Sequence, residues 1–136
     1  MSINSGISDM LQGIVNEYGE PIVSLELVSG NELVDNSAVI DTGFNGYLSI
    51  SKNVLKRLDW QFIGYEEYEL ANGTRFKEKI YLGRIVFDGE AHEVLVVATD
   101  SEDALIGTKL LKEKILTINF RMNMIEIVDA DVEIAE

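Results

Sequence analysis

The sequence predicts a mainly β protein that forms one domain and carries one or two short helices. Three observations lead to this fold class. Short apolar or alternating segments recur along the chain and are separated by turn signals rich in glycine and asparagine. The composition, with 46% hydrophobic and 26% charged residues, is that of an ordinary globular protein. The 136 residues can bury one core, so we expect a single domain over residues 1–136 with its core at about 13–128.

The N-terminal third is expected to form three strands. Residues 13–16 and 22–28 have β-type sequences on either side of Tyr18-Gly19-Glu20-Pro21, which predicts a hairpin. Ser29-Gly30-Asn31 ends the second of these strands. The apolar run Ala38-Val39-Ile40 then predicts a buried strand.

The middle of the chain is expected to contain a short helix between strands. Residues 48–50 predict a strand, and residues 51–59 predict the helix, which Ser51 or Ser49 can cap. A β segment starts at about Trp60 and reaches Leu70.

Hairpins dominate the next part of the chain. Ala71-Asn72-Gly73-Thr74 predicts a hairpin turn, since Asn-Gly suits a type I′ turn. Residues 76–87 predict a long β region interrupted by Gly83. Asp88-Gly89 predicts a second hairpin turn, after which residues 92–98 run back.

The C-terminal part combines a solvated acidic loop, an apolar strand and a last hairpin. The loop is residues 100–103, and the apolar run ending in glycine is residues 104–107. Residues 108–113 are expected to form one or two helical turns. The hairpin joins residues 115–120 to residues 124–128.

Composition and charge exclude several classes of function. The chain has no cysteine, which excludes disulfides, thiolate nucleophiles and sulfur-rich zinc sites. Its single histidine, His92, excludes an imidazole-rich metal site within one chain and is expected to be a surface strand residue without a role. A net charge of −13 should repel nucleic-acid backbones.

No membrane or export segment is predicted. The chain has no apolar run near the roughly 20 residues that a membrane helix requires. Residues 1–6 have neither the basic start nor the apolar stretch of a signal peptide. We therefore expect a cytoplasmic protein with no membrane partner, no nucleic-acid partner, no cofactor and no metal.

Asp41-Thr42-Gly43 is the strongest candidate for a functional motif. It follows the apolar strand 38–40, so its aspartate projects from a rigid strand end on a tight turn that Gly43 permits. A second apolar run ending in glycine, Leu105-Ile106-Gly107, comes later in the chain. The Asp-Thr-Gly motif occurs once, and the chain has no internal repeat that would supply a second aspartate.

These segments resemble the retropepsin-like aspartic proteases (clan AA), which are single-domain, homodimeric relatives of pepsin. Asp41-Thr42-Gly43 is similar to the family's active-site turn, and Leu105-Ile106-Gly107 to its second hydrophobic-hydrophobic-glycine element. Ala71-Asn72-Gly73-Thr74 falls where the family has its flap, the hairpin that closes over substrate. Asp41-Thr42-Gly43-Phe44 resembles most a bacterial and cyanobacterial branch named for its Asp-Thr-Gly-Phe motif.

The resemblance implies a closed β-barrel like one half of pepsin, a homodimer, and hydrolysis of peptide or protein substrates as an aspartic endopeptidase. Asp41 from each of two protomers would form the catalytic dyad. Thr42 would hydrogen-bond across the dimer axis, and Gly43 would bring its N–H close to the carboxylate. Leu105, Ile106 and Gly107 would support the active-site loop, and Ala71, Asn72, Gly73 and Thr74 would bind substrate.

Other interpretations remain open from the sequence. The same fold could serve as a catalytically silent, homodimeric module that binds peptides or proteins, and a carboxylate metal site is a third possibility. Phe44 stands where many relatives have alanine or serine. In retroviral members the chain termini interleave into a dimer sheet, whereas residues 115–128 here predict a hairpin. Four aromatic residues are expected to pack in the core or on a sheet face, although they could line a peptide groove: Trp60, Phe62, Tyr65 and Tyr68.

Overall fold

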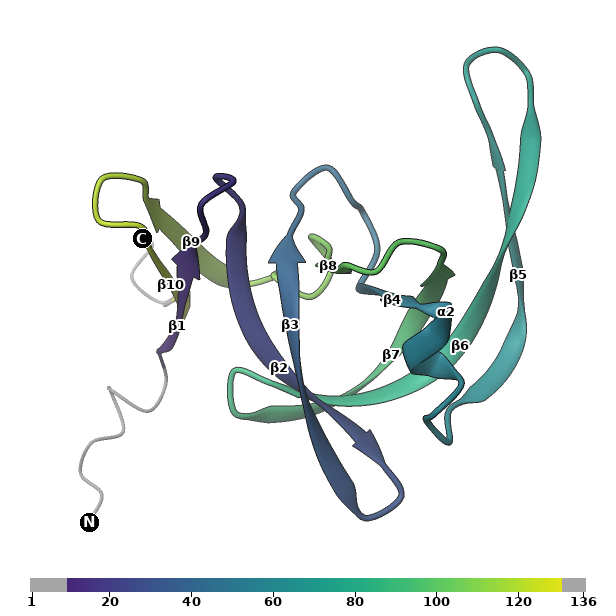
Figure 1. The fold of residues 1–136 in the computed structure, drawn as a ribbon, viewed down its shortest axis with the longest axis horizontal. Helices are drawn as coiled ribbons and strands as arrows, with labels where there is room; N and C mark the ends of the chain where they lie inside the picture. The colour runs from purple at the N-terminus through teal and green to yellow at the C-terminus, as the bar shows by residue number, and fades with distance from the viewer. Residues whose placement is uncertain (1–9, 131–136) are drawn as a thin grey trace.

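A computed structural model describes residues 10–130, and residues 1–6, which lack a signal-peptide pattern, lie outside the described residues. Ten strands form one sheet in this part of the chain, in the order β5-β6-β7-β4-β8-β3-β2-β1-β10-β9. The mainly β class is confirmed (Figure 1). The strands are β1 Leu11–Val15, β2 Pro21–Ser29, β3 Glu32–Ile40, β4 Leu48–Ser51, β5 Gln61–Glu69, β6 Arg75–Phe87, β7 Glu90–Thr99, β8 Ala104–Ile106, β9 Lys114–Asn119 and β10 Met124–Asp129.

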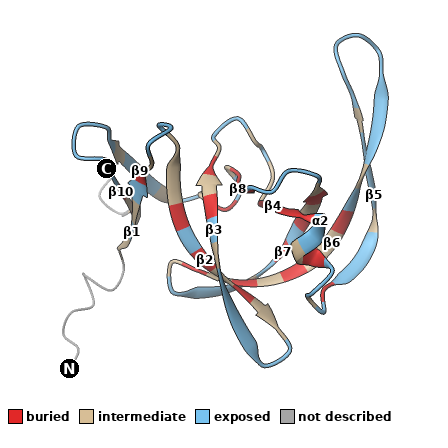
Figure 2. Ribbon diagram, in the orientation of Figure 1, coloured by how far each residue is buried: buried red, intermediate tan, exposed pale blue. Residues whose placement is uncertain are grey.

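Six of the strands close into a barrel. An additional pairing of β6 with β2 joins the two ends of the run β6-β7-β4-β8-β3-β2. At this closing seam Leu27 lies opposite Ile85, and both side chains are fully buried. The buried residues concentrate on the barrel strands, where inward-facing side chains alternate with outward-facing ones (Figure 2). The closed barrel implied by the sequence resemblance is therefore confirmed.

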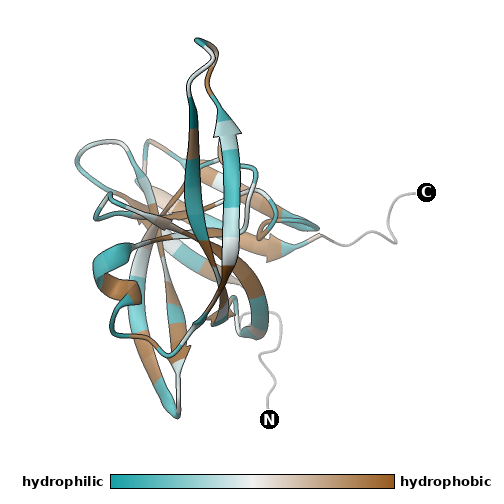
Figure 3. Ribbon diagram, turned by 90° about the vertical axis from the view of Figure 1, so that its right-hand side faces the viewer, coloured by the Kyte–Doolittle hydropathy of each residue, from teal (hydrophilic) through white to brown (hydrophobic). Residues whose placement is uncertain are grey.

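Two structures extend from the barrel. On one side β5 pairs with β6 to form a long hairpin, called the flap hairpin below, whose tip stands clear of the barrel (Figure 3). On the other side β1 pairs with β2 and with β10, and β10 pairs with β9. The first and last strands of the described chain thus lie side by side.

The predicted helix over residues 51–59 is wrong in length. Helix α2 spans only Lys52–Leu55, and the Ser51 hydroxyl caps it by accepting a hydrogen bond from the Val54 N–H at 3.2 Å. Four residues beyond the helix, Asp59 is held by a distant part of the chain, since the Gly30 N–H of the β2–β3 turn donates to Asp59 Oδ2 at 2.9 Å. Local helical periodicity could not reveal this tertiary contact.

Residues 108–113 do not form the helical turns expected of an α-helix. Instead they make hydrogen-bonded turns, in which the Leu110 N–H donates to Gly107 O and the Leu111 N–H donates to Thr108 O. These bonds join residues three apart, as in a 3₁₀ turn, rather than the four of an α-helix.

Two glycine predictions also need correction. Gly83 does not interrupt β6, which continues to Phe87. A Cβ at Gly83 would lie 2.9 Å from the ring of buried Trp60, so this glycine makes room for the indole, whose Nε1–H donates to Val28 O at 2.8 Å. At the flap tip only Gly73, with φ +88°, has a positive φ, so Asn72-Gly73 is not a type I′ turn.

Candidate active site

Asp41 begins a loop that the strand order holds in place. Strand β8 lies between β3 and β4, parallel to β3 and antiparallel to β4. Residues 41–47, which connect β3 to β4, therefore cross over the C-terminal end of β8. The Asp41 N–H continues the sheet by donating to Ile106 O at 2.9 Å. The carboxylate accordingly projects from the end of a hydrogen-bonded strand.

Gly107 lies directly beneath this loop. The segment after β8 donates backbone hydrogen bonds to the loop: the Gly107 N–H donates to Tyr47 O at 3.0 Å and the Thr108 N–H donates to Phe44 O at 2.9 Å. A Cβ at Gly107 would lie 2.2 Å from Gly46 O, a backbone atom that cannot move aside. Only glycine fits this position.

The Asp41 carboxylate is anchored by its own turn. Oδ1 accepts a hydrogen bond from the Gly43 N–H at 2.9 Å, and the Phe44 N–H donates to Asp41 O at 3.0 Å. Thr42 and Gly43 are exposed at the surface, and Asp41 is partly exposed. Among residues 10–130 no other group donates a hydrogen bond to this carboxylate. One carboxylate oxygen thus remains available to a partner, a water molecule or a substrate.

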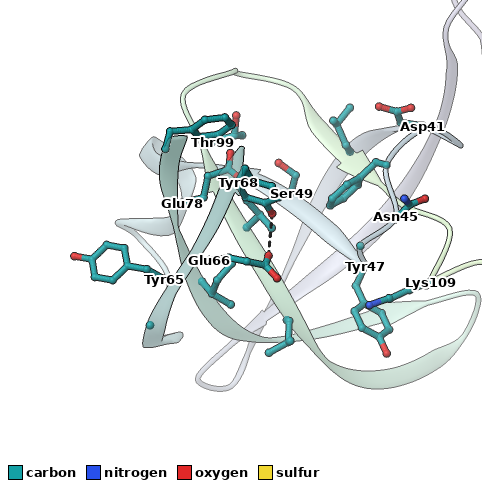
Figure 4. Close-up of a pocket in the computed structure, with 18 of the residues that line it drawn as sticks. Asp41, Asn45, Tyr47, Ser49, Tyr65, Glu66, Tyr68, Glu78, Thr99 and Lys109 are labelled. Carbon is teal, nitrogen blue, oxygen red and sulfur yellow. Dashed lines mark hydrogen bonds between the residues drawn. The ribbon is translucent and has the colours of Figure 1, made fainter. Parts of the chain in front are cut away.

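Asp41 opens onto a cavity of about 850 Å³ between its loop and the flap hairpin. Asp41, Asn45, Tyr47 and Lys109 lie on one side of the cavity, and Glu66, Tyr68 and Glu78 lie on the other (Figure 4). The Lys109 ammonium group lies 5.8 Å from the centre of the Tyr47 ring. The cavity therefore has a charged loop side and an acidic flap side.

The flap side of the cavity is a pair of facing strands. Glu66 lies opposite Glu78 and Tyr68 lies opposite Phe76 in the β5–β6 register. The Tyr68 hydroxyl donates to Glu66 Oε1 at 2.8 Å. Burial, the hydrogen bond to Glu66 and the charges of Glu66 and Glu78 raise the pKa of Tyr68 well above its usual value of 10. The phenol therefore stays protonated and remains a donor.

The structure brings some of the sequence-predicted site residues together and separates others. Asp41, Gly43 and Leu105 line the cavity, whereas Ile106 is fully buried beneath it. The four residues of the flap tip, Ala71, Asn72, Gly73 and Thr74, are exposed and do not line the cavity. The flap lines it instead through residues closer to the barrel.

Sequence reasoning did not single out the inner flap residues Glu66, Phe76 and Glu78, or Tyr47 and Lys109 from the loop side. The period-two alternation of β5 and β6 could have indicated which flap residues share a face. Of the four aromatic residues, Trp60 packs in the core and Phe62 packs edge-to-face on Tyr65 and Tyr81, while Tyr65 and Tyr68 line the cavity.

No group of three or more histidine, aspartate or glutamate side chains within residues 10–130 is placed to hold a metal ion. The acidic loop of residues 100–103 contacts the start of α2, because Asp100 forms an ion pair with Lys52 of that helix at 2.9 Å. His92 lies in β7 with its side chain 32% exposed, away from the Asp41 cavity. None of the helices in the described part of the chain is long and apolar enough to span a membrane.

Comparison with known proteins identifies the fold. No protein-family model matches the sequence, and no curated protein matches it. Among solved structures, a retropepsin-like aspartic protease from Rickettsia conorii matches with a TM-score of 0.63 and 18% identity, covering 87% of this chain and 89% of that one.

Two viral proteases match with lower scores. The protease of EIAV, solved in complex with the inhibitor HBY-793, has a TM-score of 0.56 and 13% identity over 71% of this chain and 89% of its own. The protease of simian foamy virus (mac) has a TM-score of 0.52 and 16% identity over 66% of this chain and 90% of its own. With its closed barrel and its Asp41 loop over β8, the chain has the fold of the retropepsin-like aspartic proteases.

Proposed function

We propose that the chain is an aspartic endopeptidase whose dyad is formed by Asp41 from two protomers. The observation that carries the proposal is the position of Asp41, which ends a barrel strand, is oriented by the Gly43 N–H and opens onto a cavity beneath the flap hairpin. The proposal includes a single domain over residues 1–136, a cytoplasmic location and the Asp-Thr-Gly-Phe branch expected from the sequence.

The chemistry follows from pairing two carboxylates. Two such groups about 3 Å apart cannot both ionise, so the pair shares one proton. The ionised member removes a proton from water, and the protonated member polarises the scissile carbonyl. In this proposal Asp41 of each protomer takes one role, Thr42 joins the two turns and the flap hairpin binds an extended peptide through its backbone.

Asp41→Asn is the direct test, with Asp35→Asn as the matched control. Asp35 is an exposed aspartate of β3, the strand that leads to Asp41, and its carboxylate makes no ion pair within residues 10–130. We expect Asp41→Asn to lower the rate of casein cleavage at acidic pH by about a thousandfold, because general acid–base catalysis is lost. Asp35→Asn should cleave like the parent protein. Unchanged cleavage by Asp41→Asn would refute the dyad.

The second candidate is a catalytically silent module that binds peptides. The observation that favours it is that, within residues 10–130 of one chain, no second carboxylate is hydrogen-bonded to Asp41. A binding module would bind peptides in both the parent protein and Asp41→Asn, and would hydrolyse none between about pH 3 and 8. Titration calorimetry alongside the cleavage assay separates the two candidates.

A further inference from the structure

The two faces of the flap hairpin differ in how their charges are paired. On the face that does not line the cavity, each of two acids on β5 lies opposite a base on β6: Glu67 opposite Lys77 and Glu69 opposite Arg75. In the second pair the Arg75 Nη2 atom lies 3.5 Å from Glu69 Oε1. The charges on this face of the hairpin are therefore complementary.

The cavity face of the hairpin carries a like-charge pair instead. Glu66 lies directly opposite Glu78, and both residues line the cavity. Like charges directly opposite one another on neighbouring strands destabilise a hairpin. No lysine, arginine or histidine within residues 10–130 forms an ion pair with either carboxylate. The hairpin therefore presents two negative charges to the cavity without a cation of its own.

The one cation of the cavity lies on the other side. Within residues 10–130, Lys109 is the only lysine or arginine that lines the cavity, and it lies beside Tyr47 on the loop side, across from Glu66 and Glu78 (Figure 4). Lys109 forms no ion pair in this part of the chain. The cavity of about 850 Å³ thus separates opposite charges that do not contact one another, and it leaves space between them for a ligand.

Two aromatic residues complete the cavity face of the hairpin. The rings of Tyr68 and Phe76 stack with their centroids 5.4 Å apart, one residue pair along from the two glutamates. The Tyr68 hydroxyl donates to Glu66 Oε1 at 2.8 Å, which holds that carboxylate in place and leaves its other oxygen as an acceptor. Aromatic rings beside carboxylates suit a lysine or arginine side chain, because the rings contact its aliphatic stem and attract its charge.

We infer that the flap side of the cavity binds a lysine or arginine side chain of the peptide substrate between Glu66 and Glu78. The inference rests on the proposed function, since it takes the cavity to be the place where a peptide lies. A cationic side chain relieves the repulsion between the two carboxylates. An uncharged side chain leaves that repulsion in place, and an acidic side chain adds to it.

Cleavage of matched peptides tests this preference at about pH 6, above the usual titration range of glutamate in model peptides. The peptides differ at one position, which holds lysine, arginine, glutamate or norleucine, an uncharged residue with an unbranched stem like that of lysine. We expect mass spectrometry to place lysine or arginine at a fixed position relative to the cleaved bond. The kcat/KM for these peptides should exceed that for the norleucine peptide by about tenfold, since each partly exposed ion pair contributes up to about fivefold.

The double variant Glu66→Gln with Glu78→Gln removes both carboxylates, and Glu67→Gln is the matched control from the other face. The double variant should fold, because it relieves a like-charge pair, and thermal unfolding checks this. We expect its preference for lysine over norleucine to fall to within about twofold, whereas the control keeps the preference of the parent protein. In Glu78→Lys the glutamate peptide should become the better substrate. A parent protein that cleaves lysine and norleucine peptides equally, or a double variant that keeps the preference, would overturn the inference.

Peptide binding to Asp41→Asn gives a measurement that does not depend on cleavage. We expect titration calorimetry to show the lysine peptide binding about tenfold more tightly than the norleucine peptide, and this difference should disappear when both glutamates are also replaced by glutamine. If binding shows this preference but the parent protein cleaves no peptide, the inference stands and the protease proposal fails. If the parent protein cleaves peptides without a charge preference, the protease proposal stands and the inference fails. Calcium that binds more tightly than the lysine peptide, and only when both glutamates are present, would assign the two carboxylates to a metal ion and overturn the inference.

Discussion

Gly107 illustrates how a single residue determines the position of the Asp41 loop. Its missing side chain lets the loop carbonyls of Phe44 and Gly46 lie directly against the backbone. Those same carbonyls accept hydrogen bonds from the Thr108 and Lys109 N–H groups. A side chain here would therefore push on backbone atoms that also orient Asp41.

Gly107→Ala should destabilise the protein and reduce cleavage together. Overpacking against backbone that cannot relax typically costs about 1–3 kcal/mol of unfolding free energy, and displacement of the loop would misplace Asp41. Urea unfolding and the casein assay measure the two effects.

Gly30→Ala is the control for this substitution. Its Cβ would meet no atom within 4 Å, and its φ of +59° alone would cost about 1 kcal/mol. Cleavage by the control should be unchanged. Normal stability and activity of Gly107→Ala would show that the loop does not depend on this contact.

Lys114 fixes the β9–β10 hairpin to the barrel. Its Nζ donates to Asp88 Oδ2 at 2.9 Å in the β6–β7 turn and also bonds to Asp129 at the end of β10. The Lys114 and Asp88 side chains are only 8% and 4% exposed. Burial alone would lower the pKa of Lys114, but its hydrogen bonds to Asp129 and Asp88 and their charges outweigh burial and raise the pKa above its usual 10.5.

Lys114→Met should lower the unfolding free energy by about 3 kcal/mol, because it leaves the Asp88 carboxylate buried without its cation. Since the folded-state pKa of Lys114 is raised, the contribution of Lys114 to the free energy of unfolding is complete below about pH 10.5. It is lost as the pH rises through the folded-state pKa. Thermal unfolding of the parent protein and of Lys114→Met should be followed from pH 7 to 11. The difference in stability between the two proteins should narrow only at the alkaline end of this range.

The exposed Lys112 supplies the matched control. Lys112→Met should change stability by less than about 0.5 kcal/mol. A Lys114→Met variant as stable as this control would mean that the buried ion pair does not hold the hairpin.

Elements set by local chemistry were predictable from the sequence, and those set by distant contacts were not. The turn at Asp88-Gly89 follows from its residues, and both have the positive φ of a type I′ turn. The segment after α2 is bound to Gly30 through Asp59, and Gly83 lies within β6 against the ring of Trp60. No pattern near residues 51–59 or 76–87 encodes these contacts.

At the scale of the whole molecule, the motif predicted the position of Asp41 but not the rest of its cavity. Asp41-Thr42-Gly43 after an apolar run is a local signal, and the structure places it at the end of β3 as expected. Glu66, Glu78 and Lys109 reach the same cavity only because the barrel closes between β6 and β2 and places the base of the flap hairpin across the cavity from the Asp41 loop (Figure 4). That convergence is a property of the fold.

A mixing experiment tests most directly whether the active site needs Asp41 from two copies. A fixed amount of the parent protein is mixed with increasing Asp41→Asn protein, allowed to exchange subunits, and assayed for cleavage. If only dimers with two Asp41 side chains are active, cleavage should fall to about half at an equal ratio and to about a tenth at a ninefold excess. Cleavage that stays constant as Asp41→Asn is added would contradict a site shared between two chains.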